Sequence, residues 1–125
     1  MDVTPLVKAG QQILQSYSAG RFRVSGVVYE GALIVLPEAT QRWDFAGAVE
    51  ELGEADFEPL IEQASEIDVI LLGCGTAIQF LPSSLKNALK ARGLNIEVMD
   101  TGAACRTYNV LMADGRRVAA ALLPF

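Results

Sequence analysis

The back half of the chain carries the clearest pattern of apolar and polar positions. Residues 68–73 are apolar without alternation after the leading aspartate, which is typical of a central strand covered by helices on both faces. Residues 82–92 begin with proline, carry basic residues in the last turn and are followed by Gly93, which predicts a helix. Residues 95–100 alternate apolar and polar side chains, and this predicts a second strand. Strand, helix and strand in this order predict a βαβ unit with parallel strands and a right-handed crossover.

The front of the chain has the pattern of an antiparallel hairpin. The Ser-Gly pair at residues 25–26 separates the run 21–24 from a longer run over residues 27–36. A two-residue break of this kind favours a tight turn between paired strands. Gly31 interrupts the longer run, so that position is either a bulge or a second turn. A further strand is expected near residues 41–45.

The most lopsided charge in the chain lies between Asp44 and Asp68, where there are nine acidic residues and no basic one. Apolar residues recur there with the spacing i, i+3, i+4 and i+7, which predicts an amphipathic helix. Asp56 can cap this helix, and Pro59 is tolerated because it lies in the first turn. The acidic face is either an ordinary solvated surface or a docking surface for a basic partner. The apolar positions are Phe57, Leu60, Ile61 and Ala64.

The end of the chain adds one more helix and one more strand. Thr101 can act as the N-cap of a helix that runs to about Ala113, and the apolar residues 118–123 then form a last strand. The whole pattern predicts an α/β fold: a single compact three-layer domain over residues 1–125, with a central mixed sheet, an N-terminal antiparallel hairpin and a C-terminal βαβ unit. Residues 1–16 are weakly patterned, and we expect them to form a loosely held arm.

Composition narrows the chemistry open to this domain. The 125 residues include no histidine and two cysteines, which excludes imidazole catalysis, His-containing zinc sites and four-thiolate metal sites. We therefore expect no metal site and no cofactor, and we assign no catalytic residue. The net charge of −5 argues against nucleic-acid binding, which needs a basic surface. No signal-like or membrane-spanning segment is visible, so we expect no membrane insertion and a cytoplasmic protein with reduced thiols.

Candidate chemistry lies in the two loops that follow the predicted parallel strands. Ligands of open α/β sheets bind beyond the carboxyl ends of such strands, so both loops are expected to border one cleft that Cys74 and Cys105 approach. Backbone N–H groups at the start of the last helix attract anions, and Arg106 adds a guanidinium one turn further along. The candidate binding residues are Gly73, Cys74, Gly75, Thr76, Asp100, Thr101, Cys105, Arg106 and Asn109.

Each of these features also has a purely structural interpretation. The Gly-Cys-Gly turn at residues 73–75 begins like a dinucleotide fingerprint, but Ile78 stands where the third glycine belongs. The glycines equally permit a tight turn and close packing. Arg106 either binds an anion, or pairs with Asp100 or a neighbouring carboxylate while Thr101 and Asn109 satisfy backbone groups. Cys105 either is a reactive thiol, with its pKa lowered by the helix dipole and Arg106, or is a small buried apolar residue.

Separated motifs along the chain resemble one known family. They lie at residues 26–37, 69–76, 96–111 and 115–124. The family is small, is described as a domain of unknown function, and includes a mitochondrial respiratory complex I assembly factor and an adipogenesis-associated protein. The resemblance implies a three-layer α/β fold with a central mixed sheet and no enzyme activity. It places the family's shared motif at Gly73, Gly75, Asp100, Thr101, Cys105 and Asn109.

Two functions from different classes follow from these observations. The leading hypothesis is a non-catalytic soluble accessory protein that binds other proteins and assists the assembly of a membrane respiratory complex. Its partners would be subunits of that complex, whose basic cytoplasmic loops would suit the acidic face. The alternative is an anion-binding protein or thiol-dependent enzyme that uses the cleft at the carboxyl ends of strands 68–73 and 95–100. Arg106 would hold the anion, Cys105 would be nucleophile or redox centre, and Asp100 would be acid or base. A homo-oligomer that covers apolar surface is a third interpretation.

Overall fold

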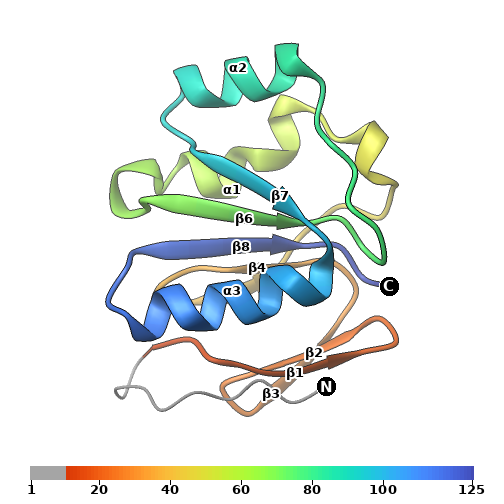
Figure 1. The fold of residues 1–125 in the computed structure, drawn as a ribbon, viewed down its shortest axis with the longest axis vertical. Coiled ribbons are helices and arrows are strands. Elements are labelled where there is room, and N and C mark those ends of the chain that lie inside the picture. The colour runs from red at the N-terminus through yellow and green to blue at the C-terminus, as the bar shows by residue number, and fades with distance from the viewer. Residues whose placement is uncertain (1–10) are drawn as a thin grey trace.

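The computed structural model describes residues 11–125, which form two β-sheets and the helices that cover them (Figure 1). The first sheet is antiparallel, with the order β1 (Leu14–Ser18), β2 (Arg21–Val24) and β3 (Val27–Glu30). The second has the order β5 (Thr40–Arg42), β4 (Leu33–Val35), β8 (Val118–Leu122), β6 (Val69–Gly73) and β7 (Ile96–Met99). The α-helices are α1 (Glu58–Ile61), α2 (Ser83–Ala91) and α3 (Thr101–Ala113). No helix within the described residues is long and apolar enough to cross a bilayer.

The five-stranded sheet is mixed, as the sequence predicts. Strands β6 and β7 run parallel and are joined by α2, so the predicted βαβ unit is confirmed. Strand β8 lies between β6, to which it is parallel, and β4, to which it is antiparallel. All five residues of β8 are buried, because a central strand has neighbours along both edges and packed elements on both faces.

The side chains of the central strands point alternately into two apolar cores on opposite faces of this sheet. One core contains Ile34 and Leu72 together with α2 and apolar residues of the segment 43–67. The other contains Leu33 and Leu71 together with α3 and the inner face of the three-stranded sheet. Figure 1 shows α3 lying across the five-stranded sheet with the three-stranded sheet beside it. This layering confirms the predicted α/β class.

The turn between β2 and β3 is the one that the Ser-Gly pair predicts. Val24 pairs with Val27 across it, and Ser25 and Gly26 have φ angles of 46° and 87°. Two consecutive positive φ angles match the twist of a tight hairpin. Gly31, with φ of 85°, is a second turn rather than a bulge, and it carries the chain from the three-stranded sheet into β4 of the other sheet.

The acidic segment does not form the single amphipathic helix that its spacing predicts. Pro59 lies in the first turn of α1, and Asp56 accepts the backbone N–H of Gly53 at 2.8 Å instead of capping a long helix. A spacing of three, as between Phe57 and Leu60, fits a 3₁₀ turn as well as an α-turn. Both side chains are fully buried, so the prediction is right about burial and wrong about helix length. The turns flanking α1 are Val49–Glu51, Glu54–Phe57 and Ala64–Glu66.

The predicted loose arm over residues 1–16 is wrong for its last part. Leu14 is fully buried at the start of β1, and Tyr108 of α3 donates a hydrogen bond to the Gln12 carbonyl at 2.9 Å. The arm was expected because residues 11–16 lack a clear period in sequence, whereas the side chains of α3 supply the order. Residues 1–10 lie outside the described part of the chain.

Replacement of Gly31 by alanine tests the turn between the sheets. A Cβ at this position meets nothing within 4 Å, so the cost comes from the positive φ alone, and we expect a loss of about 1 kcal/mol in the free energy of unfolding. Gly53→Ala is the matched control, because Gly53 has φ of −125° and is expected to change stability by less than about 0.5 kcal/mol. Urea unfolding followed by circular dichroism measures both variants, and equal stability of the two would contradict the assignment.

Candidate functional site

The two loops predicted to form a cleft are instead joined to each other by a buried hydroxyl. Thr101 is fully buried, its Oγ1 accepts the backbone N–H of Gly75 at 2.8 Å, and its hydroxyl donates to the Leu123 carbonyl at 2.7 Å. The backbone N–H of Thr101 also donates to the Gly75 carbonyl at 2.9 Å. The start of α3 is therefore tied to the loop after β6 and to the residue after β8.

Gly73 makes this contact between β6 and α3 possible because it has no side chain. A Cβ on Gly73 would lie 2.9 Å from Cα of Thr101 and 3.0 Å from its Oγ1, and no real Cβ tolerates a backbone atom so close. The glycine thus permits close packing of β6 against α3, which is the structural interpretation of the Gly-Cys-Gly turn.

Asp100, not Thr101, caps α3. The Asp100 Oδ1 accepts the backbone N–H of Ala103 at 2.8 Å, and Asp100 is extended, with ψ of 159°, as an N-cap must be. The Thr101 side chain is turned into the protein instead. The prediction that Thr101 is the cap is wrong by one residue, and the carboxylate at this helix end disfavours the anion site that we expected there.

Cys105 is not the reactive thiol that its place on a helix suggests. The side chain is fully buried, and this burial raises its pKa to about 12 despite the nearby charge of Arg106. Cys105 belongs to the core beneath α3, whereas Cys74 packs against the core on the other face of the sheet. The two thiols therefore do not approach a common cleft.

The remaining polar residues of α3 bind the N-terminal strand. Asn109 is buried and pairs with the backbone of Leu14, since its Oδ1 accepts the Leu14 N–H at 3.1 Å and its Nδ2 donates to the Leu14 carbonyl at 2.6 Å. Arg106 donates from Nη1 to the hydroxyl of Tyr17 at 2.6 Å. Within the described residues Arg106 thus bonds to a tyrosine hydroxyl and forms no ion pair with a carboxylate, whereas Asn109 and Thr101 satisfy backbone groups as the structural interpretation expects.

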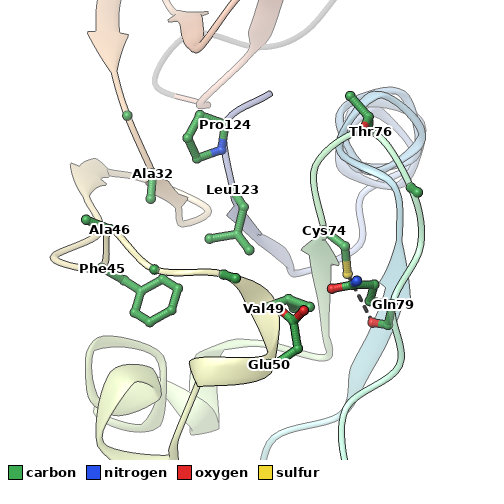
Figure 2. A pocket seen from close by; sticks show the side chains of 14 residues that line it. Ala32, Phe45, Ala46, Val49, Glu50, Cys74, Thr76, Gln79, Leu123 and Pro124 are labelled. Atoms are coloured by element: carbon green, nitrogen blue, oxygen red, sulfur yellow. Dashed lines mark hydrogen bonds between the residues drawn. The ribbon is translucent and has the colours of Figure 1, made fainter.

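A cavity of about 450 Å³ lies at the carboxyl ends of β6 and β8. Of the predicted site residues it is lined by Cys74 and Thr76, and no residue of the segment 100–109, most of which is α3, contributes. Figure 2 shows the segment 45–50 along one side, the segment 74–79 along the other, and Leu123 and Pro124 between them. The lining residues are Gly31, Ala32, Phe45, Ala46, Gly47, Ala48, Val49, Glu50, Cys74, Thr76, Ala77, Gln79, Leu123 and Pro124.

The cavity has one charged side chain in its lining and one thiol, whose reactivity is low. Cys74 is half-buried, and its burial raises the thiol pKa above its usual value. Its Sγ lies 3.3 Å from the carbonyl oxygen of Gln79, to which it donates. Glu50 is the charged residue of the lining. Among the residues that the structure describes, no three His, Cys, Asp or Glu side chains come together as metal ligands do.

Sequence reasoning found one wall of this cavity and missed the other. The rule that ligands bind beyond the carboxyl ends of parallel strands led to Cys74 and Thr76. Phe45, Val49 and Glu50 were missed because they follow the short antiparallel strand β5 and reach the cavity only through the position of β4 beside β8. The alanines and glycines clustered around residues 46–48 were the available signal.

The chain is similar to known proteins over most of its length. Residues 14–123 match the profile of a family described as a protein of unknown function (DUF498/DUF598). The chain belongs to this family. The motif resemblance noted in the sequence is thereby confirmed. An uncharacterized protein of Rhodobacter capsulatus is 40% identical over 93% of this chain and 87% of its own length.

Other relatives carry a functional name. The human protein named NADH dehydrogenase (ubiquinone) 1 alpha subcomplex assembly factor 3 is 31% identical over 89% of this chain, and its Danio rerio counterpart is 33% identical over 90%. This chain spans 60% of the human protein's length and 64% of the Danio rerio protein's.

Solved structures of the same fold agree with this placement. A crystal structure from Bordetella parapertussis superposes with a TM-score of 0.83 at 32% identity, covering 95% of this chain and 100% of that one. A solution structure from Bordetella pertussis, described as an Mth938-like domain, gives 0.75 at 27% identity, covering 99% and 92%.

Replacement of Asn109 by leucine tests its structural role. The change leaves the N–H and carbonyl of Leu14 unpaired in the core, and each such group costs about 1–3 kcal/mol, so we expect the free energy of unfolding to fall by about 3 kcal/mol. Asn87→Leu on α2, where Asn87 is exposed, is the control and should change stability by less than about 0.5 kcal/mol. Urea unfolding measures both, and similar losses in the two would refute the role.

The two thiols should differ in reactivity. At pH 8 in the native protein we expect a disulfide reagent to modify Cys74 first and Cys105 only as the chain unfolds, because the pKa of Cys105 is about 12 and thiolate is the reactive form. A thiol whose pKa rises on folding stabilises the fold below its unfolded pKa near 9, so stability falls as pH rises from there toward 12. Mass spectrometry of a Cys74→Ser variant checks the assignment: modification of this variant as fast as of the wild type would overturn it.

Proposed function

We propose that this protein is a non-catalytic accessory protein that binds other proteins and assists the assembly of a membrane-bound respiratory complex. The observation that carries the proposal is the 31–33% identity to the human and Danio rerio assembly factors over 89–90% of this chain. Those relatives are longer than this chain, so the comparison concerns only the part of them that this chain matches.

The geometry of the predicted cleft supports a binding role over a catalytic one. Thr101, Asp100, Arg106 and Asn109 each use their polar atoms to hold other parts of the chain. Catalytic groups need to face the substrate with a pKa suited to proton transfer or attack. The buried Cys105 does neither. The proposed contact surface is the cavity lined in part by Cys74 and Thr76.

A second candidate, small-molecule binding, rests on the size of that cavity. Its volume of about 450 Å³ falls in the range of roughly 300–1,000 Å³ that small-molecule pockets occupy. The lining contains Glu50 and no basic side chain, so this candidate takes a neutral or cationic molecule rather than the anion first considered. Thermal-shift screening of metabolites separates it from the leading proposal, because a stabilising ligand raises the melting temperature by mass action.

Deletion of the gene in a native host that has a respiratory NADH dehydrogenase tests the leading proposal. We expect the assembled complex, measured on native gels and by NADH oxidation in membranes, to fall several-fold. Re-expression of the wild-type chain should restore it. The ATP synthase is the control complex and should stay constant. An unchanged amount of NADH dehydrogenase complex in the deletion strain refutes the proposal.

A further inference from the structure

The cavity carries charge of one sign. Glu50 lines it, and no Lys or Arg is among the lining residues. Glu50 is exposed, and none of the ion pairs within residues 11–125 involves it. It belongs to the stretch between Asp44 and Asp68 that has nine acidic residues and no basic one. A carboxylate without a cationic partner beside a cavity favours a positively charged ligand.

The walls of the cavity are apolar and small. Ala32, Val49 and Leu123 are buried side chains in its lining, and Figure 2 shows the Phe45 ring on the same side as Ala46. Alanine or glycine occupies much of the remaining wall, at residues 46–48 and at Ala77. Such walls leave room for a side chain brought in from outside and expose backbone groups to the segment that carries it.

Exposed apolar residues adjoin lining residues of the cavity in the sequence. Ile78 and Phe80 lie on the same segment as the lining residues Thr76 and Gln79, and their exposed fractions are 47% and 78%. Phe125, next to the lining residue Pro124, packs against the Tyr17 ring and is 39% exposed. A ligand larger than the cavity would therefore cover further apolar area, which is typical of a surface that contacts protein.

We propose that the cavity receives an apolar side chain from an extended segment of a partner protein, with a Lys or Arg of that segment placed against Glu50. This inference rests on the proposed function and names the chemistry of the partner. The apolar anchor enters between the segments 45–50 and 74–79, while the cation stays near the rim, where its attraction to Glu50 steers encounter.

A second copy of this chain does not match this description. Phe80 is the most exposed large apolar side chain of residues 11–125, and no Lys or Arg lies within five residues of it in the sequence. The run at residues 21–24, which does combine arginine with apolar residues, is held in the middle of the three-stranded sheet with Phe22 and Val24 buried. Neither segment combines a free apolar side chain with a neighbouring cation, so the expected occupant is a different protein.

Selection from a displayed library of random ten-residue peptides on the full chain tests this inference. We expect the enriched peptides to share an aromatic or aliphatic residue adjacent to Lys or Arg. Their binding, measured by fluorescence anisotropy, should weaken as salt is raised, because exposed charge attraction is screened. Enrichment of acidic peptides, or no enrichment over the bare support, would overturn the inference.

Matched variants test whether the selected peptides bind at the cavity. Ala46→Trp fills the cavity from an exposed loop position, and Glu50→Lys reverses its charge; we expect each to weaken the selected peptides about tenfold or more, roughly 1.4 kcal/mol per tenfold. Ala39→Trp, exposed at the other end of β4, and Glu62→Lys, exposed outside the lining, are the controls and should bind as the wild type does. Equal binding by the cavity variants and their controls would overturn the site, and circular dichroism verifies that all four variants fold.

The same variants separate this inference from the proposed function. Ala46→Trp should fail to restore the NADH dehydrogenase complex in the deletion strain, while Ala39→Trp should restore it. If the deletion lowers the complex and Ala46→Trp restores it fully, the inference fails and the function stands. If peptides select the cavity and the deletion changes nothing, the cavity binds as described and the assembly role fails.

Discussion

The hydroxyl of Thr101 holds together the three chain segments on which the rest of the structure depends. It accepts from the loop after β6 and donates to the residue after β8, at the point where α3 begins. A buried hydroxyl that lost either partner would carry a desolvation cost, so the three segments keep one relative position. Gly73 makes the joint possible because no Cβ separates β6 from Thr101. The joint fixes α3 on one face of the sheet and leaves the cavity wall at residues 74–79 on its other side.

The parts of the fold that depend on local sequence patterns could be predicted, and those that depend on pairing between distant segments could not. The strands β6, β7 and β8 and the helices α2 and α3 were predicted because their signals are local: apolar runs or alternation for the strands, and end signals for the helices. The length of the acidic helix was not, because the spacing between Phe57 and Leu60 is shared by α and 3₁₀ turns. The place of β8 between β4 and β6 depends on pairing with residues more than 40 positions away in the chain, which no local pattern records.

The candidate site divides along the same line. The loop after β6 was found because it follows a predicted parallel strand, and ligands of open α/β sheets bind beyond the carboxyl ends of such strands. The segment after β7 satisfies the same rule, yet most of it is helix α3, and the polar atoms of Asp100, Arg106 and Asn109 meet Ala103, Tyr17 and Leu14. Sequence shows that a residue can donate or accept but not which partner it meets. The segment 45–50 lies at the cavity because β4 pairs with β8, far along the chain. No local sequence pattern shows this pairing, so the segment was missed.

Polar side chains after a parallel strand often face a ligand in α/β proteins. In this protein they form hydrogen bonds with other parts of the chain. Asp100 occupies the helix terminus that an anion would need, and Asn109 and Tyr108 fix the three-stranded sheet to α3. What remains at the carboxyl ends of the strands is a cavity of apolar walls with a carboxylate beside it. Burial raises the pKa of the Cys74 thiol in that cavity, which lowers its reactivity. Such a surface selects by shape and charge, and selection of that kind is what a protein needs when it holds a partner without transforming it.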